Sequence, residues 1–147
     1  MKRIILLMMM VGLLTGCGKK EVANVDAEEV ANSLLNEVTY DGNMDQMSDD
    51  MITLLYDVSA EDVSKQFVYC STDATADEVA VFEATSEEAS KRIEDVVNQR
   101  VEDQKTSFEG YAPNEVEKLE KAVVKRIGNV VALSVSSDSD KAKEILK

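Results

Sequence analysis

Apolar residues recur at helical spacing in three parts of the chain. Asp26 followed by Glu29 has the spacing of a capping box, and the apolar residues behind it predict a helix over residues 26–39. A longer apolar stripe begins after Thr85-Ser86-Glu87-Glu88 and predicts one long helix that Gly110 and Pro113 stop. Ser137 to Asp140 then offers caps for a terminal helix. The positions of the two longer stripes are Val30, Leu34, Leu35 and Val38, and Ala89, Ile93, Val96, Val97, Val101 and Phe108.

Four other segments are rich in β-branched residues and alternate with period two. They predict strands over residues 66–71, 78–84, 120–127 and 130–136. Gly128-Asn129 between the last two indicates a two-residue hairpin, because Gly and Asn tolerate positive φ angles. Apolar residues fall on both faces of these strands, so we expect helices to cover both faces of the sheet.

The methionines after the first helix also recur at helical spacing. Met44, Met47, Met51 and Leu55 lie three, four and four residues apart, and Ser48 is a plausible cap for a helix over 48–56. The predicted order is therefore α-α-β-β-α-β-β-α. The expected fold class is α+β, with a four-stranded antiparallel sheet of two hairpins packed against a long central helix and shorter flanking helices.

The first residues of the chain differ from the rest in character. Lys2 and Arg3 precede a mostly apolar run over 4–14, which at 1.5 Å per residue is too short to span a bilayer and reads as a secretory signal. Leu14, Thr15 and Gly16 before Cys17 match the lipobox that a lipoprotein signal peptidase recognises. We expect a signal peptide over 1–16, a lipidated Cys17 with a tether to residue 25, and a single α+β domain over 26–147.

Lipidation at Cys17 would place the domain on the outer face of the cytoplasmic membrane, with membrane lipid as its first partner. It would also leave Cys70 without a partner, so we expect Cys70 to be a buried structural thiol. No other partner is specified by the sequence, although another envelope protein or polymer fits this location.

Charge and composition exclude several classes of function. The net charge is −13, and it becomes −15 once a leader carrying Lys2 and Arg3 is removed, so nucleic-acid binding is not expected. The chain contains no His, which excludes a Ser-His-Asp triad and any imidazole-based zinc site. We expect no cofactor.

The remaining candidates for a binding surface are Met44, Met47, Met51, Glu83 and Tyr111. Clustered thioethers can bind Cu(I), but their helical spacing is more typical of a packing or partner-facing surface. Glu83 stands among apolar strand residues, where either a half-buried ion pair with Lys or Arg or a solvated strand end fits. Tyr111 follows Gly110 as an aromatic anchor in a rigid loop, for which packing is the simpler role.

Acidic groups elsewhere do not predict catalysis or a metal site. Glu78 and Glu83 are five residues apart, so on one strand they point to opposite faces and cannot form a carboxylate pair. Asp138, Asp140 and Glu144 lack the Gly and Glu spacing of an EF-hand, and helix capping explains them.

Several runs together resemble a known family. The lipobox, EVAVFEA, RVEDQKTSFEGYAP and KLEKAVVKRIGNVVALSVSSD are similar in order to clostridial-type lipoproteins that contain domain of unknown function 4358, over roughly residues 25–147. The resemblance implies a Gram-positive, membrane-anchored protein. It implies no catalytic residue, because that family carries no established activity.

The sequence therefore predicts an extracytoplasmic lipoprotein that acts as a non-catalytic binding or accessory module of the cell envelope. An enzyme that acts on envelope polymers through carboxylate acid/base residues is one alternative. A carrier of a metal or small ligand is another.

Overall fold

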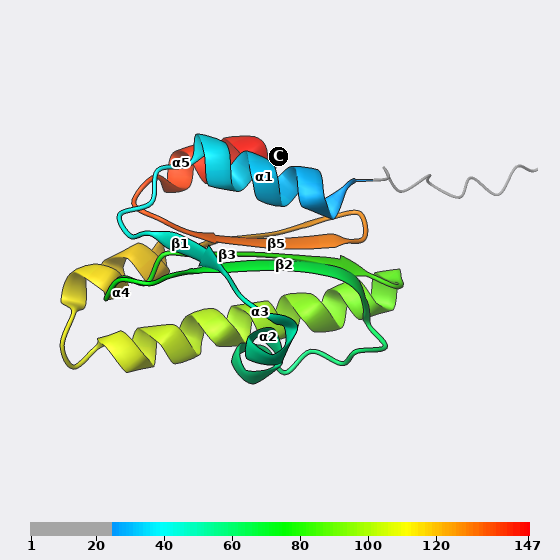
Figure 1. The fold of residues 1–147 in the computed structure, drawn as a ribbon, viewed down its shortest axis with the longest axis horizontal. Coiled ribbons are helices and arrows are strands. Elements are labelled where there is room, and N and C mark those ends of the chain that lie inside the picture. The colour runs from blue at the N-terminus through cyan, green and yellow to red at the C-terminus, as the bar shows by residue number, and fades with distance from the viewer. Residues whose placement is uncertain (1–24) are drawn as a thin grey trace, which may run out of the picture.

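A computed structural model describes residues 25–147 as a sheet of five antiparallel strands with helices on both faces (Figure 1). The strand order is β1-β2-β3-β5-β4. The α+β class and the helices on both faces are confirmed. The strands are β1 (Met44–Gln46), β2 (Val63–Ser71), β3 (Glu78–Ala84), β4 (Val123–Ile127) and β5 (Val130–Val135).

Two helices cover one face of the sheet: α1 (Ala27–Glu37) and α5 (Ser139–Ile145), above the sheet in Figure 1. Asp26 caps α1 by accepting hydrogen bonds from the backbone N–H groups of Glu28 and Glu29. Asp138 caps α5 in the same way. The core on this side joins both helices to alternate residues of the central strands, including Leu34, Val79, Val81, Ala132 and Leu146.

The other face carries α3 (Glu87–Phe108), with α2 (Asp49–Leu55) and α4 (Pro113–Glu120) beside it. The long helix is confirmed, and Ser86 caps it through the N–H of Ala89. Its buried stripe packs on the opposite side chains of the same strands, and the core there includes Ile93, Val97, Phe82, Val131 and Leu133. Because β3 and β5 are apolar on both faces, they occupy the centre of the sheet.

The sheet has five strands, so the expected number of four is wrong. Met44–Gln46, which the methionine spacing assigned to a helical stripe, pairs as β1 with residues 69–71 of β2. A three-residue strand carries too little alternation to be recognised, and it forms because β2 offers a ladder of backbone partners. The helix expected over 48–56 exists as α2, with Ser48 as its cap.

A further difference lies after the long helix. Pro113, expected only to stop that helix, is the first residue of α4. The missing N–H of a proline costs nothing at the first position of a helix. Because α4 extends to Glu120, the strand expected over 120–127 begins at Val123. The hairpin at Gly128-Asn129 is confirmed, and Gly128 has a φ of 60°.

Candidate functional site

Two acidic residues stand at the start of the central strand β3, and both are almost fully buried. Asp77 is 2% exposed and Glu78 is 1% exposed. Buried carboxylates are costly unless they are paired and hydrogen-bonded, so their partners define the main polar feature of the domain.

Glu78 points toward α3 and accepts hydrogen bonds from three side chains. Arg100 donates from Nε to Oε1 at 3.2 Å and from Nη2 to Oε2 at 3.0 Å. The Tyr56 hydroxyl donates to Oε1 at 2.5 Å, and Gln104 Nε2 donates to Oε2 at 2.9 Å. The Arg100 guanidinium also lies 5.7 Å from the centroid of the Tyr56 ring. We call these four residues the Glu78 cluster.

The charges in the Glu78 cluster shift the pKa values of its members. Burial raises the pKa of Tyr56 well above its usual value, and the negative charge of Glu78 raises it further. Burial lowers the pKa of Arg100, but the charge and hydrogen bonds of Glu78 outweigh burial and raise it. Tyr56 therefore stays protonated and Arg100 stays charged at neutral pH.

Cys70 lies opposite Glu78 in the β2–β3 ladder. It is half-buried, whereas a buried thiol was expected. Burial, followed by the negative charge of Glu78, raises the pKa of the thiol to about 12. The thiolate is the reactive form of cysteine, so Cys70 is poorly suited to nucleophilic chemistry.

A second cluster surrounds the ammonium of Lys118 in α4. Its Nζ lies 2.9 Å from Asp41 Oδ2, 3.0 Å from Asp77 Oδ1 and 3.0 Å from Glu115 Oε2. The three carboxylates raise the pKa of Lys118 despite its burial, and the hydrogen bond from Lys118 lowers the pKa of Asp41. We call this group the Lys118 cluster.

Asp77 also binds the backbone that leads into β1. Its Oδ2 accepts the N–H groups of Asp41 at 3.0 Å and Gly42 at 2.8 Å. A Cβ on Gly42 would lie 2.1 Å from Ser71 Oγ and 2.7 Å from Thr75 Oγ1, so no larger residue fits there without movement. The Lys118 cluster therefore fastens α4 and the segment before β1 to the start of β3.

The buried carboxylates of both clusters have their hydrogen bonds satisfied within the fold, although the Lys118 cluster sets three carboxylates against one ammonium. Each carboxylate of Asp77 and Glu78 is hydrogen-bonded on both oxygens, and none of the hollows described along residues 25–147 is lined by either residue. Within the same residues, no group of three or more Cys, Asp or Glu is placed to hold a metal ion. The arrangement suits structural ion pairing better than acid/base catalysis.

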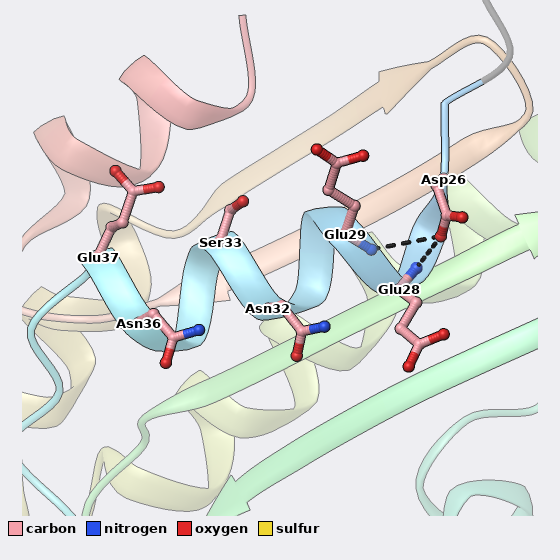
Figure 2. A pocket seen from close by; sticks show the side chains of 7 residues that line it. All are labelled: Asp26, Glu28, Glu29, Asn32, Ser33, Asn36 and Glu37. Atoms are coloured by element: carbon pink, nitrogen blue, oxygen red, sulfur yellow. Dashed lines mark hydrogen bonds between the residues drawn. The ribbon is translucent and has the colours of Figure 1, made fainter.

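The surface of the domain is hollowed at two places of interest. The outer face of α1 is a shallow, open surface lined by Asn32, Ser33 and Asn36 together with acidic residues (Figure 2). Its acids have local roles, since Asp26 caps the helix and Glu37 pairs with Lys141 at 3.1 Å. A deeper groove of about 640 Å³ lies between α2 and β2, and Thr53, Val58, Val63 and Phe67 are among its walls.

A family model for a domain of unknown function, DUF4358, matches residues 36–136, which is more than half of the chain. The chain belongs to the DUF4358 family. No curated protein and no solved structure matches it. The DUF4358 match extends from the last turn of α1 to the end of β5, so it includes both clusters and the groove between α2 and β2.

The methionines of this DUF4358 chain do not form one face. Met44 in β1 packs toward α1, whereas Met47 packs toward α2 and α3 on the opposite side of the sheet. Met51 lies in α2 with 44% of its surface exposed. The expectation that Met44, Met47 and Met51 share one helical face is wrong. Met44 and Met47 lie on an extended segment, where residues three apart point to opposite faces.

Glu83 and Tyr111 contact residues that do not belong to the Glu78 cluster. Glu83 is half-buried on the α1 side of β3, where it accepts a hydrogen bond from Ser64 and pairs with Lys65 at 3.5 Å. Of the two alternatives for Glu83, the structure has the half-buried ion pair with a lysine, and Glu83 lies on the other face of β3 from Glu78, as expected. Tyr111 is 68% exposed and its ring lies 5.3 Å from that of Phe108.

The polar clusters of the DUF4358 domain were not identified from the sequence, although one signal for them exists. Arg100 and Gln104 continue the buried stripe of α3 that passes through Ile93 and Val97, so polar residues occupy apolar positions. Such residues call for a buried partner, and Glu78 is that partner. Cys17 and the recognition residues Leu14, Thr15 and Gly16 lie outside the residues that the structure describes.

Proposed function

We propose that this DUF4358 protein is a lipid-anchored, extracytoplasmic binding or accessory module of the cell envelope, without catalytic activity of its own. The observation that carries the proposal is the run Leu14-Thr15-Gly16-Cys17 behind a short apolar segment and two cations. Diacylglycerol on Cys17, together with acylation of its amino group, would hold the domain at the outer face of the cytoplasmic membrane.

Two features of the described domain support a module rather than an enzyme. Its buried acids are committed to ion pairs within the fold, at 3.0 Å for both Arg100–Glu78 and Lys118–Asp77. The hollow on α1 and the groove between α2 and β2 both open onto the surface. No helix within residues 25–147 is long and apolar enough to cross a membrane.

The proposal is tested by metabolic labelling with a fatty acid, followed by membrane fractionation. The wild-type chain should incorporate label and sediment with membranes. Cys17→Ala should lose the label, because it lacks the thiol that accepts diacylglycerol. It should either remain uncleaved or be released from the membrane.

Cys70→Ala is the matched control, since it removes the other cysteine and leaves Cys17 in place. It should be labelled as the wild type is. Equal labelling of the wild type and Cys17→Ala would overturn the proposal.

A further inference from the structure

The strand β2 is longer than its outer neighbour β1, and part of its edge is therefore open. β1 pairs only with residues 69–71 of β2, and the N–H of Met47 then donates to the carbonyl of Val68 at 2.8 Å. Past this point the chain turns away into α2. Among the described residues 25–147, the stretch of β2 over residues 63–67 has β3 on one side and no strand on the other.

Backbone groups on this open edge are available for pairing. Successive residues of a strand direct their N–H and C=O groups to opposite neighbours. The carbonyl of Val68 points toward β1, so the backbone of Gln66, two residues away, faces the same open edge. The Gln66 side chain donates a hydrogen bond to Asp49 Oδ1 at 2.9 Å.

The groove of about 640 Å³ between α2 and β2 runs beside this edge. Val58, Val63 and Thr53 line it beside α2, whereas Phe67 and Lys65 line the edge from the other face of the sheet, where Phe67 packs on the α1-side core and Lys65 pairs with Glu83. An extended segment placed there would continue the line of β1 and present alternate side chains to these walls. The open edge of 63–67 and this groove are together called the β2 groove.

The charges around the β2 groove indicate which kind of polypeptide segment would bind there. The two stretches that flank it carry exposed acids, with Asp49 and Asp50 in α2 and Asp57 and Glu61 in the connection to β2. The only cation among residues 47–67 is Lys65, and it is engaged by Glu83 at 3.5 Å. The groove therefore favours a basic partner, and a second copy of this acidic chain would be repelled.

We propose that the β2 groove binds an extended, basic segment of a partner polypeptide by adding it to the sheet as a strand antiparallel to β2. This inference rests on the proposed function, because it identifies the surface through which the module would act. Natural edge strands are otherwise kept short or covered, since an open one invites pairing.

The test uses the full-length protein in mild detergent and a fluorescent seven-residue peptide in which lysine and valine alternate. Anisotropy should show saturable one-to-one binding. A peptide with glutamate in place of lysine should not bind. A peptide with all backbone amides N-methylated keeps its charge but loses its donors, and it should bind at least about tenfold more weakly.

A pair of variants separates the groove from general electrostatic attraction. Thr53→Arg places bulk and positive charge in the groove and should weaken binding at least about tenfold. Leu54→Arg makes the same charge change at the adjacent residue, which is 79% exposed and does not line the groove. It should change the affinity by less than about threefold. Amide hydrogen exchange at Gln66 should slow when the peptide is bound.

Absence of saturable binding, equal binding of the N-methylated peptide, or equal effects of the two arginine variants would overturn the proposal. These outcomes are separate from those of fatty-acid labelling, because peptide binding by the full-length Cys17→Ala variant does not require the anchor. Fatty-acid labelling of a protein that does not bind the peptide would support the lipid anchor and overturn the proposal for the β2 groove. Peptide binding by a protein that is not labelled would support the β2 groove and overturn the lipid anchor.

Discussion

Arg100 and Glu78 form an ion pair with two hydrogen bonds that joins α3 to the central strand β3. Only 2% of the Glu78 side chain and 17% of the Arg100 side chain are exposed. The pair is shielded from solvent, and Tyr56 and Gln104 supply the remaining hydrogen bonds of the carboxylate. Loss of either ion therefore leaves the other buried without compensation.

Arg100→Met should lower the free energy of unfolding by about 3–5 kcal/mol, because it leaves the Glu78 charge unpaired. The double variant Glu78→Gln with Arg100→Met should be more stable than Arg100→Met alone, since it removes that charge. Urea denaturation measures both effects.

The control for this prediction is Lys91→Met on the same helix, which breaks the pair of Lys91 with Glu87. Both side chains are more than half exposed, at 54% and 64%, so this change should cost less than about 1 kcal/mol. If Lys91→Met and Arg100→Met lower the free energy of unfolding by similar amounts, the stabilising role of the buried Glu78 cluster is contradicted.

Gly42→Ala should destabilise the domain by about 1–3 kcal/mol, because the added Cβ would overlap Ser71 Oγ and Thr75 Oγ1. The displacement would also strain the hydrogen bond from Gly42 to Asp77. Gly110→Ala is the matched control, since no atom of residues 25–147 beyond its chain neighbours lies within 4 Å of its Cβ position, and it should change stability by less than about 0.5 kcal/mol. Thermal melts that shift equally for both variants would refute the steric explanation.

Cys70 should react slowly with an alkylating reagent in the folded protein. Its pKa is raised from 9.0 to about 12, so at pH 8 the thiolate is scarce. In a Cys17→Ser background, where Cys70 is the only cysteine, labelling at pH 8 should be at least about tenfold slower than in urea.

The same shift has a consequence for stability against alkali. Folding raises the pKa of the Cys70 thiol, so the protonated thiol makes its full contribution to the free energy of unfolding below pH 9. That contribution is lost as the pH rises toward about 12. Cys70→Ala should remove this part of the alkaline loss of stability, as measured by melts between pH 8 and 11. Rapid labelling of the folded protein at neutral pH would contradict the burial of Cys70.

The features that the sequence determined by itself depend on interactions between near neighbours. Asp26 and Ser48 are predicted caps, and the run Thr85-Ser86-Glu87-Glu88 predicted the start of the long helix without singling out its cap, Ser86. Each of these three caps accepts a hydrogen bond from a backbone N–H two or three residues ahead. The Gly128 turn and the apolar stripe of α3 are local in the same sense. Such features leave a short-range pattern because one turn of helix or one hairpin contains all of their partners.

The tertiary structure alone decided which distant residues meet. β1 exists because Met44–Gln46 finds partners in β2, more than twenty residues further along the chain. The Glu78 cluster draws its members from α3, β3 and the end of α2, and the Lys118 cluster draws its members from three separate segments. No periodic pattern records these contacts, since a buried charge specifies only that it needs a partner, and the packing of the helices on the sheet selects which residue that partner is.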